Sequence, residues 1–103
     1  MDAASKSAQR LADFLSAIKK GSRILPSGEA KALKEDISFM EMSVSILAGG
    51  DKDKINDLWG KVQNLSMFFG GDYLKGEEED QFKILKENFW KACLEKVGQI
   101  RKE

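Results

Sequence analysis

The sequence predicts an all-α protein folded as an antiparallel, up-down-up-down four-helix bundle. The chain holds a single proline, Pro26, in 103 residues, and it is rich in Lys, Glu, Leu and Ala, which favour helix. Apolar residues recur three and four positions apart in four segments. Only short connections separate these segments, so sequential helices should pack antiparallel. The length predicts a single domain over residues 1–103.

The first helix is predicted over about residues 3–20. Lys19 and Lys20 precede Gly21, which is typical of a helix end. The face expected to turn to the core consists of Ala4, Ala8, Leu11, Leu15 and Ile18. This face is rich in alanine and has few bulky apolar side chains. The alternative architecture is therefore a three-helix core with a peripheral first helix.

The second helix is predicted over about residues 29–48, after Pro26 interrupts the helical pattern. Its main apolar face consists of Leu33, Ile37, Met40, Val44 and Leu47. A second apolar group, Phe39, Met42 and Ile46, lies far round the helix from that face at about 100° per residue. A helix this apolar is either more buried than its neighbours or buries a second face against something else.

The third helix is predicted over about residues 54–69. Gly49 or Gly50 can end the preceding helix in the left-handed conformation, and Asp51 or Asp53 can cap the third helix. Gly60 points away from the apolar face and weakens the helix by about 1 kcal/mol relative to alanine. That face consists of Ile55, Leu58, Val62, Leu65 and Phe69.

The fourth helix is predicted over about residues 77–100. It begins at the acidic run Glu77–Asp80, and acidic side chains stabilise the positive end of a helix dipole. Its inner face consists of Phe82, Leu85, Phe89, Ala92, Cys93, Val97 and Ile100. Cys93 is the single cysteine, so no internal disulfide can form, and we expect its thiol to be buried.

The residue inventory excludes several kinds of catalytic and metal site. The chain has no histidine and one cysteine. Histidine-dependent catalytic triads, histidine-ligated zinc or haem, thiolate metal cages and iron–sulfur clusters are therefore excluded. We expect a protein that is not an enzyme and that holds no metal and no cofactor.

Charge and hydropathy predict a soluble, cytoplasmic protein. The 17 basic residues balance 17 acidic ones, and no region is basic enough to follow a phosphate backbone, so no nucleic-acid partner is expected. No apolar run approaches membrane-spanning length, so no membrane insertion is expected. The first residues lack the apolar segment of a secretory signal.

Several large apolar residues are left over once the four inner faces are assigned. They form three groups: Phe39, Met42 and Ile46 on the second helix, Trp90 and Leu94 on the fourth, and Met67, Phe68 and Tyr73 around the end of the third. One reading is that these residues finish the core, because wide apolar faces are normal in globular bundles. The other is that one group is an exposed anchor patch, since Trp, Tyr and Met are enriched at such surfaces.

The third group predicts a hydrophobic lip at one end of the bundle. Phe68 and Phe69 stand about 100° apart on a helix, so they cannot both point inward. Phe69 continues the inner face, which turns Phe68 away from it. We expect Phe68, Tyr73 and Leu74 to form the lip beside the acidic start of the fourth helix. Such a lip suits a partner whose apolar anchor is flanked by Lys or Arg.

The expected function is that of a non-enzymatic protein-interaction module, such as an adaptor, assembly factor or regulatory subunit. It would present an apolar patch to a protein partner, and a second copy of the chain is one candidate partner. The alternative is a carrier of a hydrophobic small molecule bound between the helices, which predicts a cavity. A third class, an enzyme working with carboxylates and lysines alone, predicts a cleft with titratable groups of perturbed pKa.

Overall fold

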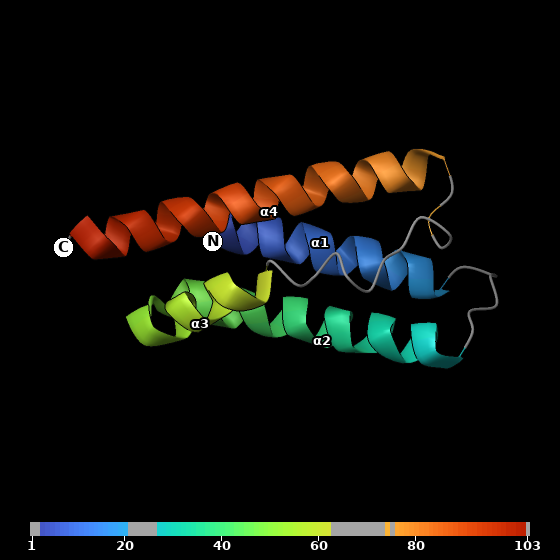
Figure 1. Ribbon diagram of the computed structural model, residues 1–103, viewed down its shortest axis with the longest axis horizontal. Helices are drawn as coiled ribbons and strands as arrows, with labels where there is room; N and C mark the ends of the chain where they lie inside the picture. The colour runs from blue at the N-terminus through green and yellow to red at the C-terminus, as the bar shows by residue number, and fades with distance from the viewer. Residues whose placement is uncertain (1–2, 21–26, 63–73, 75, 103) are drawn as a thin grey trace.

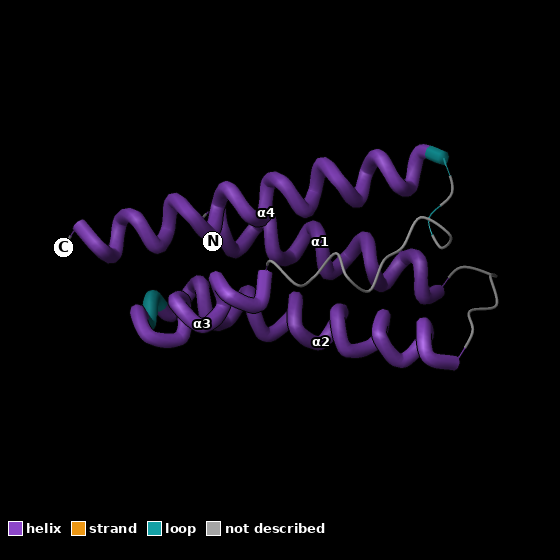
Figure 2. The backbone as a smooth tube through the Cα atoms, in the orientation of Figure 1, coloured by secondary structure: helices purple, strands orange, loops and turns teal. Residues whose placement is uncertain are grey.

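The computed structural model describes residues 3–20, 27–62, 74 and 76–102 (Figure 1). These residues form four helices and no strand: α1 (Ala3–Lys20), α2 (Ser27–Gly49), α3 (Lys52–Val62) and α4 (Glu77–Lys102) (Figure 2). The all-α class and the four-helix architecture are therefore confirmed, and the up-down-up-down order stays a prediction. The third helix was expected to reach Phe69, and residues 63–69 lie outside the described residues.

Helix α1 lies in the middle of the molecule, between α2 and α4 (Figure 1). Every residue of its predicted inner face is buried, and Ala12 is buried beside them. The alternative with a peripheral first helix is therefore wrong. The physical reason is that alanine adds little bulk, so it lets neighbouring helices approach closely and bury α1 between them.

Two serine hydroxyls are buried with this packing. Ser5 of α1 donates a hydrogen bond from Oγ to the backbone carbonyl oxygen of Val44 on α2, at 3.5 Å. Ser43 donates from Oγ to the carbonyl oxygen of Phe39, one turn earlier on its own helix, at 2.7 Å. Both side chains lie in the interior, and each hydroxyl has a partner that offsets the loss of water.

The turn from α2 to α3 uses one glycine and one aspartate from the predicted alternatives. Gly50 adopts φ = 68°, the left-handed conformation that costs glycine least. Asp51 is the cap, because its Oδ1 accepts a hydrogen bond from the backbone N–H of Lys54 at 3.1 Å. The backbone N–H of Ile55 then donates to the carbonyl oxygen of Asp51 at 2.9 Å. Gly76, with φ = 57°, also adopts this conformation, directly before α4.

The hydrophobic core combines side chains from all four helices with Leu74. Its largest fully buried members include Phe89 of α4, Leu11 and Leu15 of α1, and Met40 of α2. Cys93 belongs to the same core and is 1 % exposed, which confirms the expectation for its thiol. Burial raises the pKa of Cys93 to about 12, because the thiolate form would lose its hydration.

Replacing Gly60 with alanine should stabilise the protein. Gly60 lies exposed in the last turn of α3, and a methyl group added there meets no atom within 4 Å. The gain in helix propensity predicts a rise in the free energy of unfolding of up to about 1 kcal/mol, measured by urea denaturation with far-UV circular dichroism. The control is Gly50→Ala, which also has space but a positive φ, and which should destabilise. Equal or lower stability for Gly60→Ala would contradict this account of α3.

The thiol of Cys93 should be unreactive in the native state. Ellman's reagent added to the folded protein should label Cys93 far more slowly than the same protein in denaturant, because the sulfur is buried and its raised pKa keeps it protonated. The measurement is the absorbance of the released thiolate over time. Labelling at the rate of a free cysteine peptide would show that the α4 face carrying Cys93 is open to water.

Candidate functional site

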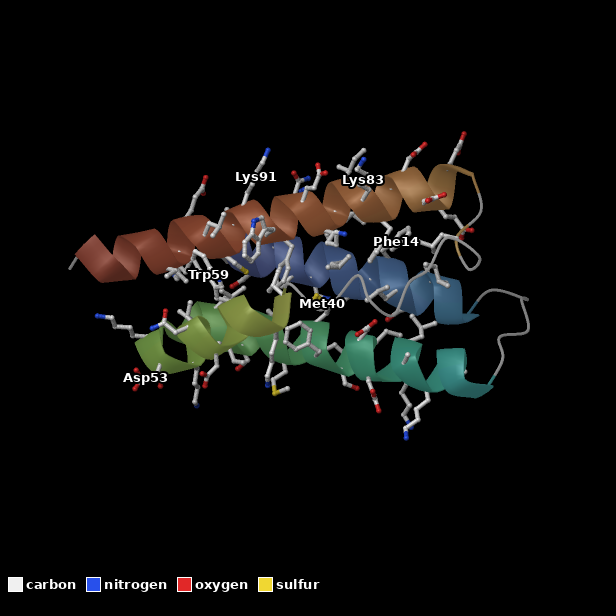
Figure 3. All side chains as sticks on the ribbon, in the orientation of Figure 1. Phe14, Met40, Asp53, Trp59, Lys83 and Lys91 are labelled. Atoms are coloured by element: carbon white, nitrogen blue, oxygen red, sulfur yellow. The ribbon has the colours of Figure 1, made fainter. Side chains whose placement is uncertain are left out.

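The three predicted apolar groups have different environments in the structure. Trp90 makes an edge-to-face contact with Trp59 of α3, with ring centroids 5.3 Å apart and an angle of 70° between the rings. Figure 3 places Trp59 on the side of α3 that faces α4. Both rings are half-buried and pack against the core. This contact gives Trp90 a structural role in joining α3 to α4. Leu94 is also half-buried.

The prediction that Leu74 belongs to a hydrophobic lip at the surface is wrong. This side chain is 4 % exposed and belongs to the hydrophobic core, so it does not stand at a surface. The physical reason is that a leucine just before a helix can turn inward and bury its whole side chain, which is worth about 2 kcal/mol. Phe68 and Tyr73, the other two members of the lip, lie outside the described residues.

The group on α2 keeps one member at the surface. Met42 is 53 % exposed, and among the described residues it is one of two exposed large hydrophobic side chains, the other being Ile84 of α4. Phe39 and Ile46 are half-buried and pack against the core. Phe39 and Met42 are three residues apart, so they share one face of the helix. The structure therefore brings Phe39 and Met42 together, and it turns both Phe39 and Ile46 partly toward the interior.

Phe39 and Met42 line a surface groove of about 510 Å³ at the junction of α2 and α3. This size falls within the range of small-ligand and peptide-anchor sites. We call it the α2–α3 groove. Its lining residues are Lys31, Lys34, Glu35, Ser38, Phe39 and Met42 of α2 and Lys61 of α3. The groove combines an apolar pair with three cations and one carboxylate.

Asp36 follows the groove residue Glu35 in the sequence and carries a buried carboxyl group. Asp36 is 4 % exposed, and within the described part of the chain its Oδ2 has no hydrogen-bond partner. Burial, with a smaller contribution from the neighbouring charge of Glu35, raises the pKa of Asp36 to about 7. Glu35 lines the α2–α3 groove while Asp36 is buried, because consecutive residues stand about 100° apart around the helix.

Asp36 is a residue that sequence reasoning missed. The signal was present, because Asp36 stands three residues after Leu33 and four before Met40, on the inner face of the helix. An acidic side chain on a buried helix face either has a charged or hydrogen-bonding partner, or its burial costs free energy. The cost here takes the form of a raised pKa, which makes Asp36 a group that titrates near neutral pH.

Two further features are absent from the part of the chain that the structure describes. It contains no group of three or more His, Cys, Asp or Glu side chains placed to hold a metal ion. Of the helices it forms, none has both the length and the apolar character needed to cross a membrane. Comparison of this chain with protein-family models, with curated proteins and with solved structures finds no significant match.

The stability of the protein should fall as pH rises from about 4 to about 7. In the unfolded chain the Asp36 carboxyl loses its proton near the ordinary aspartate pKa of 3.8, whereas in the folded protein it keeps the proton until about pH 7. Between these values the folded state binds more protons, so the contribution of Asp36 to the free energy of unfolding decreases with pH and levels off above about 7. Because one pKa unit corresponds to about 1.4 kcal/mol, the total loss is on the order of 4 kcal/mol.

The variant Asp36→Asn separates this contribution from those of other groups. Because asparagine does not ionise, the variant should gain stability relative to the native chain as pH rises, and its free energy of unfolding should vary less with pH. Urea denaturation at several pH values measures both curves. The control Glu41→Gln removes an exposed carboxylate elsewhere on α2 and should leave the slope nearly unchanged. Parallel curves for the native chain and Asp36→Asn would show that the carboxyl is not held neutral.

Proposed function

We propose that this chain is a non-enzymatic protein-interaction module that binds a protein partner in the α2–α3 groove. The observation that carries the proposal is the exposure of Met42 beside Phe39 in that groove. Leaving a methionine in water costs free energy that burial against a partner recovers. Methionine also adapts its shape to different surfaces, which suits a binding site.

The rest of α2 supports the groove as a rigid platform. Leu33, Ile37, Met40 and Leu47 are buried on the opposite side of the helix, and Phe39 itself packs on the core. A face fixed in this way loses little conformational entropy on binding, which favours affinity. An adaptor, assembly factor or regulatory subunit needs no more than such a platform. A cytoplasmic location is part of the proposal, since an unpaired cysteine is compatible with a reducing compartment.

The groove favours this proposal over the small-molecule carrier. A carrier needs a cavity between the helices, enclosed by apolar side chains. The α2–α3 groove lies instead at the surface, and its three lysines are exposed. The interior positions of the helices are occupied by packed side chains such as Phe89 and Met40. The location and charge of the groove therefore suit a macromolecular surface better than a buried lipid.

The proposal predicts that Met42→Ser loses a partner without losing stability. Immobilised native chain is used to capture proteins from cell extract, and captured proteins are quantified by mass spectrometry. At least one should fall by tenfold or more with Met42→Ser, about 1.4 kcal/mol of binding free energy. Sedimentation of the native chain and the variant at several concentrations tests a second copy of the chain as the partner.

Two control variants make the result specific to the apolar groove. Met42→Leu keeps a large apolar side chain and should retain binding. Ile84→Ser removes the other exposed large hydrophobic residue, which lies on α4, and should also retain binding. All variants should unfold at the same temperature as the native chain. Equal capture and equal self-association by Met42→Ser and the native chain would refute the proposal.

A further inference from the structure

The α2–α3 groove follows one straight face of α2. Six residues of α2 between Lys31 and Met42 line the groove. Successive members are one or three positions apart, which places all six on one face of the helix. At 1.5 Å of rise per residue the face is about 16 Å long. Lys31 and Lys34 lie toward its N-terminal end, Phe39 and Met42 toward its C-terminal end, and α3 contributes Lys61. The groove therefore has a cationic part and an apolar part.

The side chains that line the groove carry more positive than negative charge. Three ammonium groups and one carboxylate, that of Glu35, line it. Among the residues that the structure describes, no ion pair joins Lys31, Lys34 or Lys61 to a carboxylate. Cations gathered around an apolar pair repel one another, and an arriving negative charge relieves that repulsion. The groove is thus complementary to a surface of opposite sign.

We propose that the occupant of the groove is an acidic segment of a partner protein that carries one large apolar anchor. The anchor packs on Phe39 and Met42, and carboxylates beside it face Lys31, Lys34 and Lys61. This inference rests on the proposed function, because it names the chemistry of the partner at the same groove. The partner proposed for the groove is negatively charged. The partner expected at the predicted lip was positively charged, because its Lys or Arg residues would face the acidic start of the fourth helix.

The two parts of the groove contribute differently to binding. Apolar contact with Met42 and Phe39 supplies most of the affinity, since buried apolar anchors dominate interface energies. The lysines raise the association rate and reject basic segments, because like charges brought together cost free energy. Exposed charges are screened by salt over about 10 Å at 0.1 M ionic strength. Binding should therefore weaken as salt is added, while the requirement for the anchor persists.

Selection from a library of random peptides tests the inference directly. Peptides of about 12 residues span about 18 Å as a helix, which matches the length of the groove. A phage-displayed library is selected on the native chain and depleted on Met42→Ser. Enriched peptides should carry several Asp or Glu residues around one large apolar residue. One enriched peptide, synthesised with a fluorophore, then serves as the probe for affinity measurements by fluorescence anisotropy.

The charge requirement is measured with matched double variants. Lys34→Gln with Lys61→Gln should weaken binding of the probe about tenfold and reduce its dependence on salt. The control, Lys83→Gln with Lys91→Gln, removes the same charge from α4, where Figure 3 shows both lysines pointing away from the bundle. It should change the affinity less than twofold. The total charge of the protein is equal in the two variants, so a difference between them locates the effect at the groove.

The outcomes separate this inference from the proposed function. The inference is overturned if the enriched peptides are neutral or basic, or if acidic peptides bind the two double variants equally. In either case, loss of peptide binding with Met42→Ser still supports the proposed function. A selection that enriches no peptide dependent on Met42 also overturns the inference. Binding of dodecanoate that is lost with Met42→Ser, in the absence of any such peptide, assigns the groove to a small amphiphilic anion instead.

Discussion

The structure depends on the close packing of α1 between α2 and α4. The buried face of α1 alternates alanines with larger side chains, of which Leu11 and Leu15 are completely buried. Small side chains allow short distances between helices, and the larger ones then fill the space at interior density. The buried hydroxyl of Ser5 reaches the backbone of α2 within this packing. Both α2 and α4 contact α1 more extensively than they contact α3.

Two aromatic pairs fix α4 against its neighbours. Phe14 of α1 stacks on Phe82 near the start of α4, with ring centroids 6.2 Å apart and planes inclined by 16°. The ammonium group of Lys86 lies 5.8 Å from the centroid of Phe82, a favourable cation–π distance. Farther along α4, Trp90 meets Trp59 of α3. Such pairs contribute about 1 kcal/mol each beyond the area they bury. The aromatic residues of α4 thus serve the fold.

Helix α2 carries the two features that the fold does not require. Its inner face holds Asp36, a carboxyl whose burial destabilises the protein once it is ionised. Its outer face holds Met42, whose exposure forgoes the free energy of apolar burial. Proteins tolerate such local costs where a site requires them. The proposed binding function explains Met42 in this way, and nothing in the structure explains why an acid occupies position 36.

The sequence by itself determined the local structure, because helix formation depends on contacts only three or four residues apart. The periodic spacing of apolar residues could be read directly, and the turn between α2 and α3 was narrowed to Gly49 or Gly50 and Asp51 or Asp53. Only the tertiary structure decided the fate of the surplus apolar residues. Trp90 is half-buried because Trp59 of another helix meets it, and Leu74 is buried because it turns into the core. Met42 stays exposed because no described element covers it. Whether a side chain is a core residue or a surface anchor depends on what lies opposite it, and residues distant in sequence supply that surface.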